Sequence, residues 1–339
     1  MWDNVRRTAE LGSVSRHIFE RDIVASAAPC IMRGQVAKWP IVAAGARGAE
    51  ALCDYLVAHA NANPAQLWVG APGSAGRFRY TDDISDVNFE RKLVTIAQLC
   101  ELLLRCRSTP NSPSLFAGAV FIPQHLPDLL CELPMPLLGK ARERLTSLWI
   151  GNQSRTAAHW DLPQNLTCPI IGPRTFLLFP PEQIRNLYVG PIDFTLAGQP
   201  MSMVDCENPD FVRHPRFADA LAAAQVAELT PGDTLYIPSL WFHYVLSPST
   251  LGAQINFWWR EKGADMLSPS ATLLHALLTL RDLPDAERAA WRHFFDHYIF
   301  GDGHAAVAHI PMPARGALGK LTPAIEQPLR QHLAKQLLG

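Results

Sequence analysis

Two imidazoles and one carboxylate in this sequence are of the right types to hold a divalent metal ion. His159 and Asp161 lie two residues apart in T-A-A-H-W-D-L-P-Q-N, and in a β-strand that spacing directs both side chains to one face. His243 is a third candidate, because it follows a short segment that begins after a Pro-Gly-Asp turn. Together they match the facial triad that holds Fe(II) and leaves positions open for a co-substrate and dioxygen. Taken singly, each has a structural explanation: a hydrogen-bonded His159 beside an exposed Asp161, and a core His243 among aromatic neighbours.

Other patterns that carry chemistry are weaker. His293 and His297 lie four residues apart, as in zinc peptidases, but the residues between them are Phe-Phe-Asp and lack the glutamate of that motif. We expect a packing stripe there. The seven cysteines form no C-x-x-C pair, which argues against a disulfide framework and a thiolate zinc site. The sequence also has no G-x-S-x-G motif and no glycine-rich phosphate loop with a lysine.

Short apolar runs bounded by proline, glycine, asparagine and aspartate must position the three candidate ligands. The runs with strand signatures include residues 175–179, 234–237 and 253–259. Nearer the start, Phe89, Leu93, Ile96 and the leucines at 102–104 repeat at helical spacing, which predicts a helix through these residues. We therefore expect a mainly β core with flanking helices.

The pattern becomes wholly helical at residue 263, so we expect two regions, residues 1–262 and 263–339. Three apolar stripes follow: Leu273, Leu274, Leu277 and Leu278; Trp291, Phe294, Phe295 and Tyr298; Ile325, Leu329, Leu333 and Leu337. Ser268 before Pro269 and Thr322 before Pro323 predict two helix starts, and Pro328 predicts a kink or break. A tail of about 75 residues cannot bury that much apolar surface by itself. We expect it to cover the barrel or, more strongly, a second subunit in a homodimer.

The composition limits the classes of function. The chain has 339 residues, of which 48% are hydrophobic and 18% charged, and this excludes intrinsic disorder. The formal net charge of −1 provides no global field for a phosphate backbone or an anionic lipid surface. Nucleic acid and membrane partners are therefore not expected. The first residues lack a secretory signal and no run reaches the roughly 20 apolar residues of a membrane helix, so we expect a cytoplasmic protein.

Five motifs occur in order along the chain: G-R-F-R-Y (76–80), N-F-E-R (88–91), T-A-A-H-W-D-L-P-Q-N (156–165), L-F-P-P (178–181) and G-D-T-L-Y-I-P-S-L-W-F-H (232–243). In this order they resemble the Jumonji C (JmjC) or cupin-like, cupin-8 type, 2-oxoglutarate oxygenases, which include the asparaginyl hydroxylase of hypoxia-inducible factor. The resemblance extends from residue 29 to residue 260. It implies a double-stranded β-helix core, the cupin or jelly-roll barrel, followed by a helical C-terminal extension that in the asparaginyl hydroxylase makes a dimer.

The resemblance also implies roles for individual residues. His159, Asp161 and His243 would ligate Fe(II). Thr156, Asn165 and Asn256 would hydrogen-bond the co-substrate 2-oxoglutarate or its surroundings, and Trp258 would form a wall of the pocket. Independently of the family, Gln254, Asn256 and Trp258 alternate on one face of a predicted strand, which is consistent with an inward orientation.

Two residues depart from the pattern of the asparaginyl hydroxylase. Arg174 stands where that enzyme has a lysine for the distal carboxylate of 2-oxoglutarate, and a guanidinium can pair a carboxylate through two parallel hydrogen bonds. The alternative is an arginine that reaches solvent from the end of a strand. Phe116 falls where the same enzyme has a tyrosine that helps bind this carboxylate, so a hydroxyl is lost.

The sequence therefore predicts an Fe(II)- and 2-oxoglutarate-dependent dioxygenase, a hydroxylase with succinate and CO2 as co-products. The family favours a protein or peptide side chain as the substrate and leaves a small molecule open. One alternative is a catalytically silent cupin-like binding protein, with Arg174 and Phe116 as signs of drift. Another is a zinc or manganese cupin isomerase or hydrolase.

Overall fold

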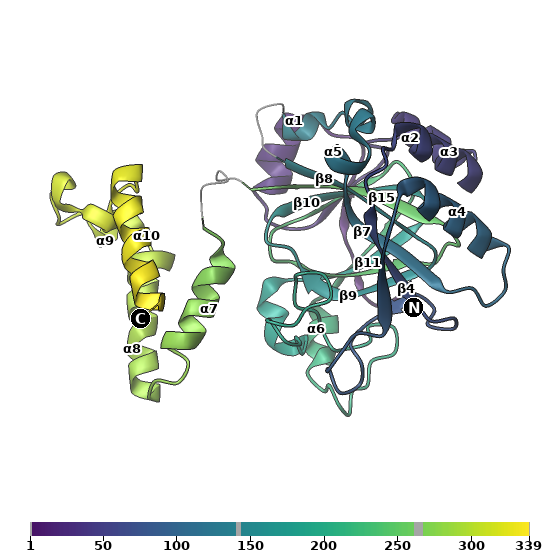
Figure 1. Ribbon diagram of the computed structural model, residues 1–339. Helices are drawn as coiled ribbons and strands as arrows, with labels where there is room; N and C mark the ends of the chain where they lie inside the picture. Colours follow the sequence, from purple (N-terminus) through teal and green to yellow (C-terminus); the bar gives the residue numbers. More distant parts are fainter. Residues whose placement is uncertain (1, 140–143, 261–266, 339) are drawn as a thin grey trace. The chain divides into compact units, whose positions relative to one another are not determined.

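The computed structural model describes residues 2–139, 144–260 and 267–338, and the chain divides into two compact units, residues 1–263 and residues 264–339 (Figure 1). The boundary that the sequence predicts between residues 262 and 263 lies outside the described residues. Among the described residues, no helix is both long enough and apolar enough to cross a membrane.

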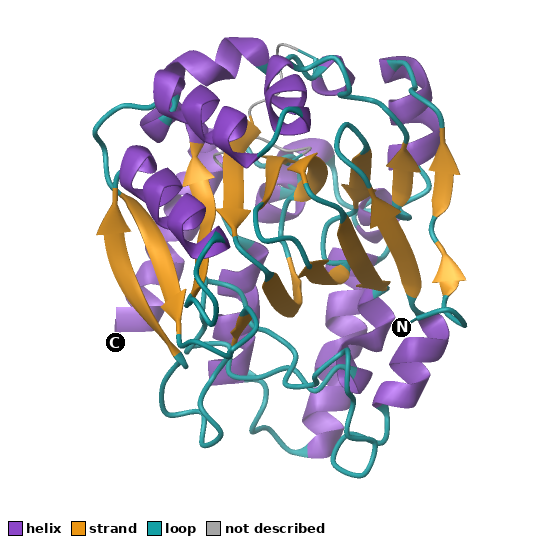
Figure 2. Ribbon diagram, turned by 90° about the vertical axis from the view of Figure 1, so that its right-hand side faces the viewer, coloured by secondary structure: helices purple, strands orange, loops and turns teal. Residues whose placement is uncertain are grey.

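Two mixed β-sheets form the framework of the first unit (Figure 2). The smaller sheet has the strand order β1 (Arg6–Arg7), β12 (Gln225–Leu229), β11 (Arg174–Phe179), β14 (Phe242–Ser247), β9 (Ser154–Trp160) and β5 (Arg77–Phe78). The larger sheet has the order β2 (Ala9–Leu11), β3 (Cys30–Met32), β13 (Thr234–Ile237), β10 (Gln164–Ile171), β15 (Gly252–Trp259), β8 (Arg144–Gly151), β7 (Ser114–Phe121), β4 (Ala65–Gly70) and β6 (Phe89–Val94).

The connectivity between the sheets is that of a double-stranded β-helix. Strand β8 belongs to the larger sheet, β9 to the smaller and β10 to the larger, and β11 returns to the smaller. After β12, the strands β13, β14 and β15 again alternate between the two sheets. The prediction of a mainly β fold with a cupin-type core, flanking helices and a helical C-terminal extension is confirmed. The three predicted strand runs correspond to β11, β13 and β15.

Helices cover the outer face of the larger sheet and leave its inner face for polar side chains. The helices of this unit are α1 (Arg16–Ile18), α2 (Pro40–Ala46), α3 (Ala49–His59), α4 (Ile96–Arg107), α5 (Ile122–His125) and α6 (Phe217–Ala223), with a π-helical turn at Phe19–Val24 and 3₁₀ turns at Pro127–Glu132, Pro136–Leu138 and Pro181–Asn186. Leu52 of α3 and Leu99 of α4 belong to one buried cluster with Ile255 and Phe257 of β15. Because strand side chains alternate between faces, the polar residues of β15 at 254 and 256 point into the barrel.

The prediction of a helix that begins at residue 89 is wrong for the first residues of that segment. Residues 89–94 form β6, which pairs with β4 over six positions, and the helix α4 begins only at Ile96. Thr95 caps α4 through a capping box in which its hydroxyl accepts the backbone N–H of Gln98 and the Gln98 side chain accepts the backbone N–H of Thr95. The pairing of β6 with β4 joins residues 19 to 29 positions apart, so local apolar spacing did not indicate it.

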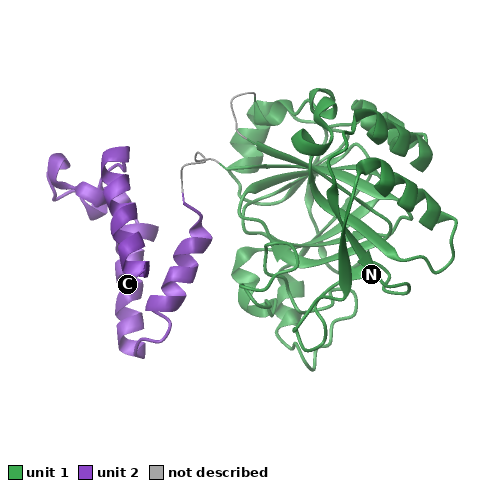
Figure 3. Ribbon diagram, viewed as in Figure 1, with its two compact units in different colours: residues 1–263 green, residues 264–339 purple. Residues whose placement is uncertain are grey.

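The second unit consists of helices with hardly any core of their own (Figure 3). They are α7 (Pro269–Thr279), α8 (Asp285–Phe295), α9 (Gly303–Ala306) and α10 (Pro323–Leu338), with a π-helical turn at Asp296–Phe300 and 3₁₀ turns at Met312–Ala314 and Gly316–Leu318. Helices α7 and α10 start at the predicted prolines. Of the predicted kink or break at Pro328, the break does not occur, since α10 continues through this residue. A proline removes only one N–H donor, so the other i to i−4 hydrogen bonds of the helix continue on either side of it.

Candidate metal centre

The first unit brings the three predicted ligands together at one end of the barrel. His159 lies near the end of β9, Asp161 directly follows that strand, and His243 is the second residue of β14. Strands β9 and β14 pair in antiparallel register with His159 opposite His243. One ligand atom from each of the three side chains lies within 4.8 Å of the others, and the described residues contain no second group of this kind. His293 and His297 are both exposed and belong to no such group.

Both imidazoles present the same nitrogen to the centre. His159 Nδ1 is 2.9 Å from the carbonyl oxygen of Ala157, and His243 Nδ1 is 3.2 Å from that of Trp241. A carbonyl oxygen only accepts, so each Nδ1 carries the proton and each Nε2 keeps its lone pair. Burial, followed by the neighbouring His159, lowers the pKa of His243 to about 4. The His243 ring is therefore neutral at physiological pH, as a metal ligand requires.

The carboxylate of Asp161 is held by two donors from the larger sheet. Its Oδ2 accepts a hydrogen bond from Asn165 Nδ2 at 3.1 Å and another from Trp258 Nε1 at 3.1 Å. The same oxygen is 3.7 Å from His243 Nε2. Asn165 and Trp258 face each other across β10 and β15, so the strand register itself directs both donors at Asp161. The sequence predicts a co-substrate role for these two residues, and their contact with Asp161 adds an orienting one.

Arg174 points into the barrel. It is 3% exposed, and its Nε is buried without a hydrogen-bond partner. Burial alone lowers the pKa of the guanidinium to about 9, and among the described residues no acidic side chain offsets its charge. Arg174 lines the same cavity as Phe116, Thr156, Asn256 and the three candidate ligands. The solvent-reaching alternative for this arginine does not apply.

Beyond the three candidate ligands, a larger cavity of about 550 Å³ opens onto His159 and Asp161. Four large aromatic side chains contribute to its walls: Trp68, Phe116, Trp149 and Trp258. Sequence reasoning missed Trp68 and Trp149, because their inward orientation depends on which strands pair. Trp149 lies opposite Gln254 across β8 and β15, and its Nε1 is buried without a partner. Among the described residues that line this cavity, Arg91 and Asp161 are the two that carry a full charge.

One side of this cavity is formed by residues between Leu196 and Met201, which are held at one end by Arg91 and at the other by a β-bridge between Met201 and His159. Arg91 Nη2 donates to the carbonyl oxygen of Leu196 at 3.0 Å, and the Arg91 guanidinium lies over the rings of Phe89 and Trp68. Arg91 belongs to the N-F-E-R motif, so this contact gives the motif a structural role.

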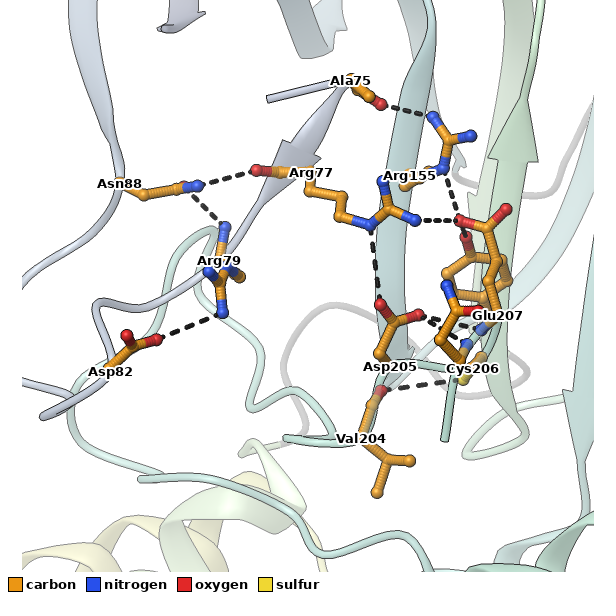
Figure 4. Close-up of polar contacts among 12 residues, drawn as sticks. Ala75, Arg77, Arg79, Asp82, Asn88, Arg155, Val204, Asp205, Cys206 and Glu207 are labelled. Atoms are coloured by element: carbon orange, nitrogen blue, oxygen red, sulfur yellow. Dashed lines mark hydrogen bonds and ion pairs between the residues drawn. The ribbon is translucent and has the colours of Figure 1, made fainter. Parts of the chain in front are cut away.

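Six residues after this wall, Glu207 is the centre of an ion-pair network (Figure 4). Its side chain is 4% exposed and pairs with Arg155 and with Arg77, whose Nη2 is 3.1 Å from Glu207 Oε2. Tyr244 donates its hydroxyl to the same oxygen at 3.0 Å. Gly76 lets the chain before β5 approach the start of β9, because a Cβ there would lie 1.9 Å from the carbonyl oxygen of Gln153. The network therefore anchors the segment at Glu207 to β5, β9 and β14.

Comparison with known proteins identifies a family model and several relatives that match this chain. Residues 15–265 match the family model described as a cupin-like domain. The chain is 34% identical to lysine-specific demethylase JMJ31 of Arabidopsis thaliana over 116 residues, which cover 34% of this chain and 21% of that protein. It is 30% identical to tRNA wybutosine-synthesizing protein 5 of Gallus gallus over 145 residues, which cover 38% of this chain and 42% of the relative.

A longer match exists with lysine-specific demethylase JMJ30 of Arabidopsis thaliana, at 26% identity over 265 residues. It covers 76% of this chain and 56% of the relative. In each of these three comparisons the match spans less than two thirds of the relative's own length.

Proposed function

The chain belongs to the family of cupin-like domains, together with JmjC proteins, and from this premise we propose that it is an Fe(II)- and 2-oxoglutarate-dependent oxygenase. More specifically, we propose a hydroxylase that releases succinate and CO2. The observation that carries the proposal is the group of His159, Asp161 and His243, with both Nε2 lone pairs free and the carboxylate held by two donors.

This set of donor atoms fits Fe(II). Two neutral imidazoles and one carboxylate are the protein ligands of non-haem Fe(II) oxygenases, whereas closed zinc sites more often add cysteine or a third histidine. When bound, iron supplies the redox chemistry that couples oxidative decarboxylation of a 2-oxoacid to oxygenation of the substrate. The chain supplies the orientation: Asn165 and Trp258 fix Asp161, and the aromatic wall keeps bulk water from the reacting atoms.

Arg174 is the residue that we propose to bind the distal carboxylate of 2-oxoglutarate. It is a buried cation with an unpartnered Nε, and it lines the cavity that also reaches the three metal ligands. A bidentate carboxylate would satisfy the guanidinium and balance its charge. Thr156 and Asn256 line the same cavity and complete the proposed co-substrate pocket.

The substrate that we propose is an uncharged side chain of a protein or peptide. The 550 Å³ cavity is lined by four aromatic side chains among other uncharged residues, and its charged members among the described residues are Arg91 and Asp161. Such a lining favours a neutral, apolar substrate group and provides no counter-charge for an ammonium or guanidinium group. The names of the relatives refer to lysine demethylation and to tRNA, so a methylated lysine or a nucleic acid is the competing outcome.

We also propose that the protein is a homodimer through its C-terminal helices. Leu273, Leu278, Phe294 and Leu337 are each more than half exposed, and Ala306 and Val307 are the only buried apolar residues among those described after residue 266. A helical unit with so little interior is not stable in isolation and needs an apolar partner surface.

The test is release of succinate from 2-oxoglutarate by purified protein with Fe(II), followed by a search for a product heavier by one oxygen atom in a peptide library. We expect Fe(II)-dependent succinate release and an added oxygen on an uncharged side chain. A protein that binds Fe(II) but turns over none of the substrates tested would instead be the catalytically silent cupin-like binding protein. Tightly bound zinc or manganese in freshly purified protein, with no Fe(II) response, would indicate the cupin isomerase or hydrolase.

A further inference from the structure

Three amide side chains and Asp161 form one continuous chain of hydrogen bonds inside the barrel. Gln254 Nε2 donates to Asn256 Oδ1 at 2.8 Å, and Asn256 Nδ2 donates to Asn165 Oδ1 at 2.9 Å. Asn165 Nδ2 then donates to Asp161 Oδ2 at 3.1 Å. All three amides are at most 5% exposed, so water does not replace these bonds. The chain runs from the co-substrate end of the cavity to a proposed metal ligand.

The direction of this chain is fixed at the carboxylate. An ionised carboxylate only accepts hydrogen bonds, so Asn165 must turn its NH2 group towards Asp161 and its oxygen towards Asn256. Asn256 must then turn its NH2 group towards Asn165 and its oxygen towards Gln254. Gln254 is therefore required to donate, and its Oε1 is directed away from Asn256.

The far end of the chain lies in the cavity that Arg174 also lines. Gln254 Oε1 and Arg174 Nε are both buried without a hydrogen-bond partner, and both residues line the same cavity. Gln254 thus adds an acceptor to this end of the cavity and Arg174 adds donors. A carboxylate is repelled by the first and attracted by the second.

From this arrangement we propose that Gln254 is a positioning residue, which orients Asp161 through Asn256 and Asn165 and directs a carboxylate to Arg174. The proposal rests on the proposed function in that Asp161 is taken as a metal ligand. Hydrogen bonds to metal-ligating side chains commonly contribute ten- to hundredfold to metal affinity. Gln254 acts on this contact through three hydrogen bonds, and it shares the donation to Asn256 Oδ1 with Thr167 Oγ1, so its contribution is to the direction of the chain.

Two substitutions of Gln254 separate direction from packing. Gln254→Glu keeps the shape but places an acceptor against Asn256 Oδ1, so Asn256 and then Asn165 must reverse and turn an oxygen towards Asp161. Gln254→Met removes the donor without adding an acceptor. Asn256 Oδ1 then still accepts from Thr167 Oγ1 at 3.2 Å, and the direction of the chain is kept. A residue that mattered only for packing would tolerate the glutamate better than the methionine.

The experiment is a titration of the full chain with Co(II), followed by its visible absorption, which reports affinity and ligand geometry without any turnover. We expect Gln254→Glu to bind Co(II) about tenfold more weakly than wild type and with an altered spectrum. Gln254→Met and Thr167→Val should stay within about threefold of wild type, since each leaves Asn256 Oδ1 with one donor.

The charge control is Arg174→Gln, which changes the net charge at this end of the cavity by the same single negative unit but leaves the amide chain intact. Gln254→Glu should bind Co(II) about tenfold more weakly than Arg174→Gln. Asn256→Asp is the second test if the glutamate variant does not fold, because it also forces Asn165 to reverse. It should show the same loss.

Equal affinities of Gln254→Glu and Arg174→Gln would overturn the inference, and so would a Gln254→Met variant as weak as Gln254→Glu. These outcomes leave the proposed function standing, provided that wild type binds one Co(II) and His243→Ala does not. A wild-type protein without Co(II) affinity would instead reject the metal site itself, and the inference with it.

Discussion

The barrel and the C-terminal helices distribute polar and apolar side chains in opposite ways. The barrel buries Asn165, Arg174, Gln254 and Asn256 at 5% exposure or less. The helices after residue 266 leave their leucines and aromatic residues exposed, among them Leu278 at 79%. Buried polar groups reduce stability unless they are paired, and exposed apolar stripes reduce solubility unless they are covered. Each region therefore carries a feature that its own folding does not require.

The two regions therefore indicate two different kinds of binding partner. In the barrel, polar groups that remain without a partner, among them Arg174 Nε, Gln254 Oε1 and Trp149 Nε1, mark where a small molecule completes the structure. In the helices, the unpaired groups are apolar and spread along several turns, which is typical of a protein partner. A substitution in one region should therefore leave the function of the other region unchanged.

Removing a metal ligand should abolish turnover. His159→Ala and Asp161→Ala each take away one of three ligand groups, so succinate release should fall to background, while the melting temperature changes by a few degrees at most. The dimer should be unaffected, because both residues belong to the barrel. If both variants retained Fe(II) affinity and succinate formation, the ligand assignment would be wrong.

Charge placed on the apolar face of α10 should dissociate the dimer. Leu329 and Leu333 lie one helical turn apart, each 37% exposed, and replacing both with arginine buries unpaired cations in an apolar interface, at a cost of several kcal/mol per charge. Light scattering should then give the monomer mass, with Fe(II) binding unchanged.

Gln327→Arg with Gln331→Arg is the matched control, since it adds the same charge to exposed polar positions of the same helix. It should leave the dimer intact. A monomeric wild-type protein at all concentrations would reject dimerisation, and a dimer that survives the leucine substitutions would place the interface elsewhere.

Loss of the buried guanidinium should weaken binding of the co-substrate rather than binding of the metal. Arg174→Ala removes a charge-assisted contact of roughly 1.5 to 3 kcal/mol, which corresponds to about tenfold to a hundredfold in the 2-oxoglutarate affinity. The measurement is the 2-oxoglutarate dependence of succinate release beside an Fe(II) titration. An unchanged dependence on 2-oxoglutarate would exclude Arg174 from the co-substrate pocket.

The smallest expected change in 2-oxoglutarate affinity comes from adding a hydroxyl group to the cavity that Arg174 lines. Phe116 lines the same cavity as Arg174, and Phe116→Tyr should tighten 2-oxoglutarate by about two- to tenfold, the value of one hydrogen bond of roughly 0.5 to 1.5 kcal/mol. Weaker binding would mean that the added oxygen clashes with the packed rings of Trp68, Phe78 and Trp149.

The sequence indicated the metal centre better than the pocket around it. His159, Asp161 and His243 could be predicted because their residue types and strand spacing are local properties. The inward orientation of Arg174 could not, since apolar residues follow it on both faces of β11 and leave the two directions equivalent. Trp149 and the donor role of Gln254 depend on the register of β15 with β8 and β10, which local patterns do not contain.

An anaerobic Fe(II) titration of the full chain, read by the visible charge-transfer band that forms when 2-oxoglutarate is added, tests the metal centre and the co-substrate pocket together. We expect one Fe(II) per chain, a band that appears only with both components, loss of Fe(II) binding in His243→Ala, and a need for more 2-oxoglutarate in Arg174→Ala. A wild-type chain that binds no Fe(II), or a His243→Ala variant with unchanged iron affinity and the same band, would contradict this expectation.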